Sequence, residues 1–222
     1  MDPRFDHIQD WIFDLDNCLY PASAGLFDLI DERMSAYIQR LLECDAAEAR
    51  RVQKHHFHAH GTTLAGLMKD HGVDPNHFLS DVHDISLDRV RCDDRLASAL
   101  GRLPGRKFVF TNGDEAYARR VLQTIGVEEH FDDLHDIHAS DYRPKPDPYG
   151  YALLCERFAI DPTHALLADD MAANLEPAKA LGMTTIWVDN GSERGSHGHG
   201  DFIDCRIASV GDWLEQILGG TE

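Results

Sequence analysis

The hydrophobic positions divide the chain into two kinds of segment. The segment that starts at residue 7 runs into WIFDLD, residues 11–16, a short apolar run that closes on acidic residues, as is typical of a buried strand whose carboxyl end faces a site. Residues 22–100 show almost no strand pattern, and their apolar residues recur at helical spacing, as at Leu26, Ile30, Met34, Ile38 and Leu41. We therefore predict one strand followed by a block of short helices.

Turn-forming residues inside this block mark the ends of its helices. Asp45 is a candidate N-cap, and Gly61 and Gly72 are candidate C-terminal stops. Asp74 followed by Pro75 is typical of a helix start, because proline is tolerated in the first turn. The block is therefore expected to contain several helices.

After residue 105 the pattern changes to strands that alternate with helices. KFVFTNG is rich in β-forming residues, and DEAYARRVLQTIGV predicts a capped amphipathic helix that ends at Gly126. The same order continues with strand segments in DLHDIHASD, HALLADD and TTIWVDN, helices over 149–158 and 172–181, and a final helix in VGDWLEQIL. The segment GSERGSHGHGDFID is predicted to be a mobile surface loop.

This alternation predicts an α/β fold built on a parallel, doubly wound sheet. In such sheets the ligand binds beyond the carboxyl ends of the strands. Those ends carry Asp14, Thr111, Asp169 and Asp170 in this sequence. The functional site is therefore expected at this edge.

Composition and charge narrow the class of partner. With 222 residues, 43% of them hydrophobic, the chain can bury one α/β core and still form a small accessory domain. The formal net charge of −18 argues against nucleic acid and anionic membranes as partners, because both would be repelled at long range. An anionic substrate must therefore be met by a local cation.

Cysteine usage and hydropathy bear on localisation. The five cysteines include no CxxC pair, so neither a disulfide framework nor a cysteine zinc cluster is indicated. No apolar run approaches the ~18 to 20 residues of a membrane span, and the start MDPRFDHIQD has no basic and apolar leader pattern. We expect a cytoplasmic protein.

Two acidic pairs lie at predicted strand ends far apart in the sequence. Asp14 and Asp16 flank Leu15 after the first strand, and Asp169-Asp170 closes a later one. Converging carboxylates repel one another unless a cation lies between them, and oxygen ligands suit Mg²⁺. Helix capping would explain one pair, but it explains both pairs poorly when other polar groups end the same strands.

Thr111 and Lys145 are those other groups. Thr111, Asn112 and Gly113 offer a hydroxyl and backbone N–H groups at a helix start, where an anion is held favourably, although the plain alternative is a helix cap. Lys145 lies in RPKPDP, whose prolines stiffen the loop and fix the direction of the ammonium. Such a lysine is suited to bind phosphate, whereas a solvated loop lysine is the simple alternative.

The segments DLDNCLYP, FTN, RPKPDP and LLADD, in this order, resemble the four motifs of the haloacid dehalogenase superfamily. The resemblance implies a three-layer Rossmann-like core formed by residues 1–20 and 101–222, with an all-helical cap domain over residues 21–100. More narrowly, DLDNCLYP, HGTTLAGL and ADDMAANLEPAKALGM resemble the pyrimidine 5′-nucleotidase-like branch.

The resemblance also implies a mechanism, that of an Mg²⁺-dependent phosphomonoesterase. Asp14 would be the nucleophile that forms an aspartyl-phosphate, and Asp16 would be the acid and base, with its backbone carbonyl on the metal. Asp170 would bind the metal directly, and Asp169 directly or through water. The remaining groups expected to hold the phosphoryl oxygens are Thr111, Asn112, Gly113 and Lys145.

The branch-level resemblance implies a small phosphorylated metabolite as the partner, specifically a pyrimidine nucleoside 5′-monophosphate. In the cap, His56, Thr62 and Thr63 are the candidates for contacting the base. His56 and His60 share a helix face, which suggests zinc, but no HExxH glutamate accompanies them, and we favour a substrate-facing or solvent-facing role for the residues 55–60. His197 and His199 are expected to be exposed.

Cys18 departs from the superfamily pattern, which usually has Thr or Val two residues after Asp16. The residue is small enough to fit. We expect a structural role, because lone cysteines are more often buried than reactive.

The same residues argue against several other classes of protein. A haloacid dehalogenase needs neither a metal nor an acid at the second motif position, so Asp16 and the pair Asp169-Asp170 argue against it. A signalling receiver also has an acidic pair, a phosphorylated Asp, a Thr and a Lys, but its pair precedes the phosphorylated Asp and it has no helical insert. A non-catalytic phosphate-binding protein is disfavoured because all catalytic positions are filled. The sequence leaves open the ester, transfer to an acceptor other than water, and whether the protein is a monomer or homodimer.

Overall fold

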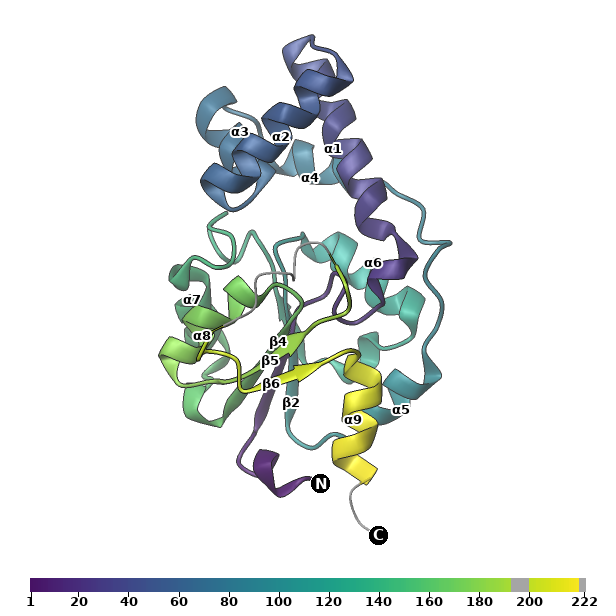
Figure 1. The fold of residues 1–222 in the computed structure, drawn as a ribbon, viewed down its shortest axis with the longest axis vertical. Coiled ribbons are helices and arrows are strands. Elements are labelled where there is room, and N and C mark those ends of the chain that lie inside the picture. Colours follow the sequence, from purple (N-terminus) through teal and green to yellow (C-terminus); the bar gives the residue numbers. More distant parts are fainter. Residues whose placement is uncertain (193–199, 220–222) are drawn as a thin grey trace.

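A single parallel sheet organises the computed structural model, which describes residues 1–192 and 200–219. Within these residues the sheet has six strands in the order β3-β2-β1-β4-β5-β6, and all neighbours pair in parallel (Figure 1). The strands are β1 Asp10–Phe13, β2 Arg106–Phe110, β3 Asp133–His135, β4 Ala165–Asp169, β5 Thr184–Val188 and β6 Cys205–Ile207. The predicted parallel, doubly wound α/β sheet is confirmed.

The strand order reverses at β1, which lies between β2 and β4. Phe13 is in register with Val109 on one side and with Ala168 on the other. The residues that follow β1, β2 and β4 therefore meet at one edge of the sheet. This reversal is the position at which open α/β sheets bind ligands.

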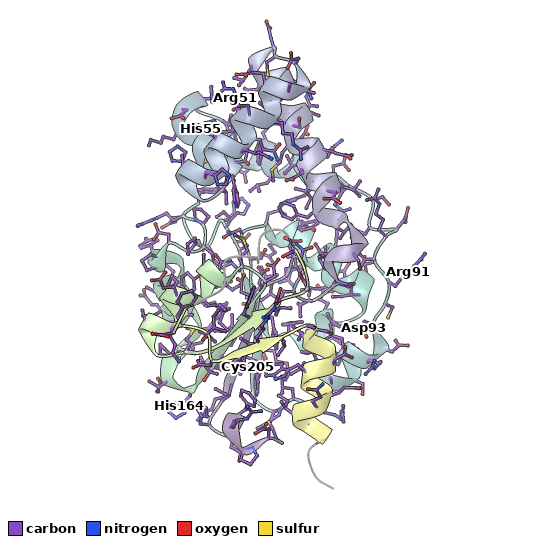
Figure 2. All side chains as sticks on the ribbon, viewed as in Figure 1. Arg51, His55, Arg91, Asp93, His164 and Cys205 are labelled. Atoms are coloured by element: carbon purple, nitrogen blue, oxygen red, sulfur yellow. The ribbon has the colours of Figure 1, made fainter. Side chains whose placement is uncertain are left out.

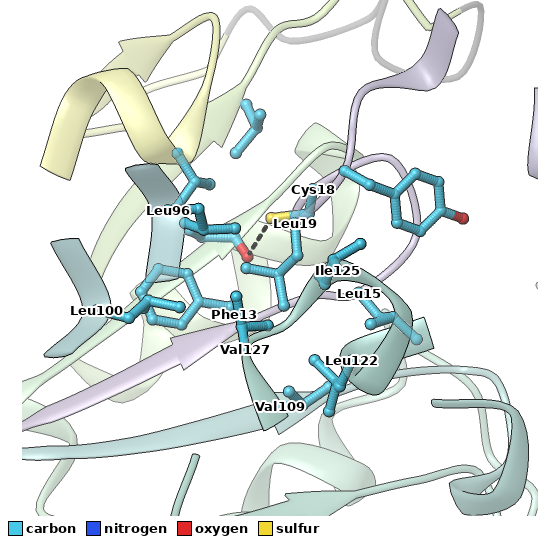
Figure 3. Packing of buried hydrophobic residues seen from close by; sticks show 14 of the residues in the cluster. Phe13, Leu15, Cys18, Leu19, Leu96, Leu100, Val109, Leu122, Ile125 and Val127 are labelled. Atoms are coloured by element: carbon cyan, nitrogen blue, oxygen red, sulfur yellow. Dashed lines mark hydrogen bonds between the residues drawn. The ribbon is translucent and has the colours of Figure 1, made fainter. Parts of the chain in front are cut away.

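Helices cover both faces of the sheet because alternate strand residues point to opposite sides. Phe13 packs in one buried cluster with side chains from α5 Asp94–Arg102, α6 Glu115–Ile125 and α9 Val210–Gly219 (Figure 3). Ile12 points to the other face and joins a cluster with α7 Pro148–Phe158 and α8 Leu175–Leu181. Helices, sheet and helices form the three expected layers.

A further group of helices, which we call the helical layer, comprises α1 Leu26–Leu42, α2 Ala46–His60, α3 Thr63–His71 and α4 Pro75–Val82. Figure 1 shows this group stacked beyond one end of the sheet. Its own buried cluster includes Ile38, Leu67 and Phe78, together with Ile137 from the loop after β3. The group therefore rests on the carboxyl edge of the sheet.

Local residues end these helices as the sequence predicts. Asp45 accepts a hydrogen bond from the Glu48 backbone N–H, and α4 begins at Pro75 with Asp74 as its N-cap. Gly61 and Gly72 end α2 and α3 with φ of 81° and 63°, values that glycine adopts without strain.

The division between residues 21–100 and the rest of the chain stays a prediction. α5 lies across its boundary, and its buried face packs with α9 in the cluster that covers the sheet. The chain thus returns to the sheet layer before residue 100.

Two predicted segments differ from the structure in detail. The helix expected over 172–181 is a 3₁₀ turn, Ala172–Asn174, followed by α8. β6 was not expected, because three residues at the edge of the sheet, two of them partly buried and one exposed, are too short a run to reveal a strand. The loop predicted to be mobile lies partly outside the described residues, and His197 and His199 fall in that part. At the end of the loop, Asp204 forms an ion pair with Lys179 at 2.6 Å.

None of the helices in the described part of the chain is long and apolar enough to cross a membrane.

Candidate active site

Asp14 lies directly after β1 at the carboxyl edge. Its backbone N–H donates to the Ala168 carbonyl at 2.9 Å, which continues the pairing of β1 with β4 by one residue. The side chain is buried, and Oδ1 accepts a hydrogen bond from Lys145 Nζ at 2.7 Å. No hydrogen bond to Oδ2 is found among the described residues, so this oxygen is available for chemistry.

Lys145 is a buried ammonium with all three of its donors engaged. Nζ donates to Asp14 Oδ1 at 2.7 Å, Asp169 Oδ2 at 2.6 Å and the Phe110 carbonyl at 2.8 Å. Burial lowers the pKa of Lys145, but the two carboxylates outweigh burial and raise it above its ordinary value. The lysine is therefore a permanent cation in the site.

Asn112 holds the loop that presents this lysine. Its Oδ1 accepts from the Lys145 backbone N–H at 2.8 Å, and its Nδ2 donates to the Lys145 carbonyl at 3.3 Å. The sequence predicts that prolines make this loop rigid. The two hydrogen bonds from the Asn112 amide, just after β2, also hold the loop in place. Asn112 thus positions Lys145.

Asp169 and Asp170 differ in their surroundings. Asp169 accepts from Lys145 Nζ, from Asn174 Nδ2 at 2.9 and 3.0 Å and from the Met171 N–H at 2.9 Å. Asp170 accepts from Ser192 Oγ at 3.2 Å. Asp169 is therefore saturated by the protein, while Asp170 retains free lone pairs.

The carboxylates carry an excess of negative charge that suits a divalent cation. Asp14, Asp169 and Asp170 each offer an oxygen within 4.8 Å of the others, and among the described residues the one cation paired with them is Lys145. Burial, with repulsion from Asp169, raises the pKa of Asp170 to about 7. Burial likewise raises the pKa of Asp14, and Lys145 opposes this shift. Buried oxygen ligands with unbalanced charge fit Mg²⁺.

Two tyrosines that the sequence analysis missed hold Asp16. Its Oδ1 accepts from Tyr20 Oη at 2.6 Å and from Tyr117 Oη at 2.8 Å. The side chain therefore turns toward α6, and its oxygens are not among those of the acidic group above. Tyr20 follows Asp16 by four residues in the first motif, whereas no local pattern could single out Tyr117.

Thr111 and Gly113 form a small turn at the end of β2. Thr111 is buried, and its Oγ1 accepts from the Gly113 N–H at 3.0 Å. The hydroxyl keeps its own proton for donation. The structure thus places Thr111 and Asn112 beside β1, at the edge where Asp14 and Lys145 meet.

Cys18 is buried against the β1 and β4 ends. Its Sγ donates to the Ala168 carbonyl at 3.5 Å (Figure 3). Burial raises the pKa of the thiol well above its ordinary value, so the thiol stays protonated. These contacts agree with the structural role expected for it.

The cap residues expected to meet a base are engaged within the helical layer. His56 is 3% exposed and packs on α3 at Gly66. Thr62 Oγ1 caps α3 by accepting from the Ala65 N–H at 3.1 Å, and Thr63 Oγ1 donates to the Gln53 carbonyl at 3.5 Å. Their contact with substrate stays a prediction. His55, from the same histidine-rich segment, lies on α2 in the helical layer (Figure 2).

A cavity of about 640 Å³ lies between the helical layer and α6. Tyr117, which holds Asp16, lines it. His83 also lines it, stacks on the Tyr117 ring at 4.3 Å between centroids, and pairs with Asp114. Other lining residues carry charged or polar groups, among them Arg33, Asn76, His77, Ser80, Arg120 and His138.

The sequence matches a known protein family and is similar to characterised proteins. The profile of haloacid dehalogenase-like hydrolases matches residues 11–182. The chain is 25% identical over 190 residues to phosphate metabolism protein 8 of Saccharomyces cerevisiae, covering 78% of this chain but only 59% of the yeast protein. It is 27% identical over 221 residues to phosphoglycolate phosphatase of Rhodospirillum rubrum, covering 91% and 89%.

A solved structure agrees at the level of the fold. The crystal structure of a HAD phosphatase from Thermococcus onnurineus aligns with a TM-score of 0.65 at 20% identity and covers 96% of this chain and 99% of that one. Because the family profile spans most of the chain and includes all the strand-end residues described above, this chain belongs to the haloacid dehalogenase-like hydrolases.

Proposed function

We propose that this chain is an Mg²⁺-dependent phosphomonoesterase that transfers the phosphoryl group of a small metabolite first to Asp14 and then to water. The observation that carries the proposal is the arrangement of Asp14. Lys145 holds its Oδ1 and leaves Oδ2 free, while Asp16, two residues later, is held by two tyrosines. A nucleophile and an acid thus lie on one short loop.

In the first half-reaction Asp14 Oδ2 attacks phosphorus. The bond from phosphorus to the ester oxygen breaks, and that oxygen takes its electron pair and receives a proton from Asp16. Lys145 fixes the orientation of the Asp14 carboxylate, while the Thr111 hydroxyl and the backbone N–H of Asn112 hold phosphoryl oxygens. The products are an alcohol and an aspartyl-phosphate on Asp14.

In the second half-reaction a water oxygen attacks the same phosphorus. Asp16 takes the proton of this water, the bond from phosphorus to Asp14 Oδ2 breaks, and inorganic phosphate leaves. Because Tyr20 and Tyr117 both bind Oδ1 of Asp16, its Oδ2 remains free to carry the proton in both directions.

Mg²⁺, when bound, supplies positive charge that offsets the carboxylates and the phosphoryl oxygens. Asp14, Asp170 and the backbone carbonyl of Asp16 would hold it. We assign Asp169 a contact through water, because its carboxylate oxygens already accept hydrogen bonds from Lys145, Asn174 and Met171.

Dehalogenation is the competing reaction within the family. It needs no acid at the position of Asp16 and no metal, and the buried acidic group would then be an uncompensated cost. The Rhodospirillum rubrum relative, which aligns with 91% of this chain, is also described as a phosphatase. Phosphomonoester hydrolysis is thus the better supported activity.

For the substrate we propose pyrimidine nucleoside 5′-monophosphates. The resemblance of DLDNCLYP and ADDMAANLEPAKALGM to pyrimidine 5′-nucleotidases motivates this choice. The cavity of about 640 Å³ beside Tyr117 has the volume of a drug-sized ligand site, and Asn76, Ser80 and His138 in its lining offer donors for base carbonyl oxygens. We propose that residues 21–100 act as the cap that encloses this substrate.

Phosphoglycolate is the second candidate, because a phosphoglycolate phosphatase aligns with 91% of the chain. Its small leaving group would leave most of the cavity beside Tyr117 unfilled. We therefore rank it below a nucleotide.

The test is a screen of phosphate release from UMP, CMP, AMP, ribose 5-phosphate and phosphoglycolate, each with Mg²⁺ and with excess chelator. Activity should depend on Mg²⁺. Asp14→Asn, a nearly isosteric change, should lower turnover by at least about a thousandfold while circular dichroism stays unchanged. Full activity in chelator, or an active Asp14→Asn variant, would contradict the mechanism.

A further inference from the structure

A second group of metal-ligating side chains lies in the helical layer, on different elements from the acidic group at the sheet edge. His56 and His60 are four residues apart on α2 and so share one face of that helix. Asp70, near the end of α3, completes the group, and each of the three side chains offers one ligand atom within 4.8 Å of the others. The two helices thus converge on one point.

His56 is the member that calls for an explanation. Its side chain is 4% exposed, and within residues 1–192 and 200–219 neither Nδ1 nor Nε2 has a hydrogen-bond partner. The nearest carboxylate oxygen, Asp70 Oδ2, is 3.7 Å from Nδ1. A buried imidazole normally satisfies both nitrogens, so an unpartnered one costs about 1 to 3 kcal/mol unless an unseen group completes it.

The local packing holds this ring in place. A Cβ at Gly66 would lie 2.3 Å from His56 Nδ1, so the absence of a side chain on α3 makes room for the ring. His71, beside Asp70, adds a third ring with its centroid 5.8 Å from that of His56.

We propose that His56, His60 and Asp70 form a binding site for a divalent transition metal of the Zn²⁺ class, separate from the Mg²⁺ site. Two imidazoles and one carboxylate suit Zn²⁺, Co²⁺ or Ni²⁺, whereas Mg²⁺ prefers all-oxygen ligands. The ion would satisfy one of the two unpartnered nitrogens of His56 and join the last turn of α2 to the end of α3. Gly61 follows His60 and would then be fixed close to the Lys145 loop. A Cβ built on Gly61 would lie 3.3 Å from Pro144 Cγ in that loop.

The site is tested by Co²⁺ titration of the full chain without a histidine tag, followed by the visible absorption of the bound ion. Millimolar Mg²⁺ is present throughout to occupy the acidic site, and the background is Asp14→Asn, which removes one of its carboxylates and so weakens Co²⁺ binding there. We expect one equivalent of Co²⁺ to bind, and Zn²⁺ to displace it and to raise the melting temperature.

His60→Gln and Asp70→Asn are the informative variants, because both side chains are less buried than His56 and their loss should leave the fold intact. Loss of outer-shell groups alone weakens metal sites 10- to 100-fold, so each variant should weaken Co²⁺ binding by at least about tenfold. His58→Gln, an exposed histidine on the same helix, is the matched control and should bind like the parent.

Binding to the parent that is no tighter than binding to His60→Gln would overturn the proposal, as would equal losses in His58→Gln. Phosphatase activity is not part of the readout, so failure of the metal site and failure of the proposed reaction are distinguished.

Discussion

Two tyrosine hydroxyls determine how Asp16 is presented to the site. Tyr20 and Tyr117 both donate to its Oδ1, and desolvation raises the pKa of each tyrosine well above its ordinary value, so both remain donors. A carboxylate held at one oxygen keeps a fixed direction for the other. This geometry is what an acid and base used twice in one cycle requires.

Asp16→Asn should therefore separate acid catalysis from nucleophilic attack. Asparagine can still accept from both tyrosines but carries no transferable proton, so transfer from a nucleoside monophosphate should slow by about 10²- to 10⁴-fold. Transfer from p-nitrophenyl phosphate should slow much less, because its leaving group needs no proton. Single-turnover phosphoryl transfer measures both.

Tyr117→Phe is the control for this comparison, since it removes one of the two donors and leaves Tyr20 in place. It should lower nucleotide turnover by only about fivefold, the effect of about one hydrogen bond. An equal slowing of both substrates by Asp16→Asn would show that Asp16 is not the acid.

At the scale of elements, the contact of α2 with α3 depends on one glycine. Gly66→Ala would gain helix propensity, about 1 kcal/mol, but its Cβ would overlap the ring and Cβ of His56, and overpacking of this kind costs about 1 to 3 kcal/mol. We expect a net loss of unfolding free energy in urea, measured with chelator present.

A double-mutant cycle checks the cause. In a His56→Gly background both the ring and the Cβ that the new methyl group would meet are gone, so Gly66→Ala should become neutral or stabilising. A loss of the same size in both backgrounds would mean that the overlap with His56 is not what matters.

His135, the last residue of β3, should make stability fall in acid. Burial lowers its pKa to about 4, and its Nε2 is 3.0 Å from Ser140 Oγ. The unfolded chain takes up a proton near the ordinary histidine pKa of 6.5, while the folded chain does not. The folded state should thus lose roughly 2 to 3 kcal/mol between pH 6.5 and 4 from this residue, and nothing above pH 7.

Urea unfolding of the parent and of His135→Gln at pH 7 and pH 4.5 measures this loss. The stability difference between the two should shrink by about 2 kcal/mol at the lower pH. His58→Gln, which changes an exposed histidine, should keep the same difference from the parent at both values. A constant difference for His135→Gln would exclude the effect.

The elements that were predictable from sequence are those whose pattern is local. Asp14, Thr111 and Asp169 directly follow or close apolar strands, so adjacency in sequence fixes their place once the sheet is parallel. The bond from Tyr117 to Asp16 spans 101 positions, and Asn112 acts on Lys145 across 33. Such pairings depend on how helices and loops pack, which periodicity does not encode.

At the scale of the whole molecule, we expect the sheet edge to bind the phosphoryl group and the helical layer to contribute to substrate specificity. In the proposed reaction the edge would hold the phosphoryl group through residues that serve any ester. The cavity beside Tyr117 is lined from both parts, by His77 on α4 and by Arg120 on α6. The net charge of −18 repels an anionic substrate at long range, so the affinity for that substrate must come from these local contacts. Specificity is therefore expected to depend on cavity residues.

Truncating the substrate tests this division. Contacts to the base can help close the helical layer over the site, so removing the base should lower kcat as well as affinity. We expect kcat/KM to fall by at least about tenfold from UMP to ribose 5-phosphate, and further for a simple alkyl phosphate. His138→Ala, which changes a cavity residue, should lower the value for UMP by about fivefold, as for one lost hydrogen bond, and leave ribose 5-phosphate unchanged. Equal kcat/KM for UMP and ribose 5-phosphate would mean that no base is recognised, and a preference for phosphoglycolate would keep the phosphatase mechanism but replace the nucleotide as its substrate.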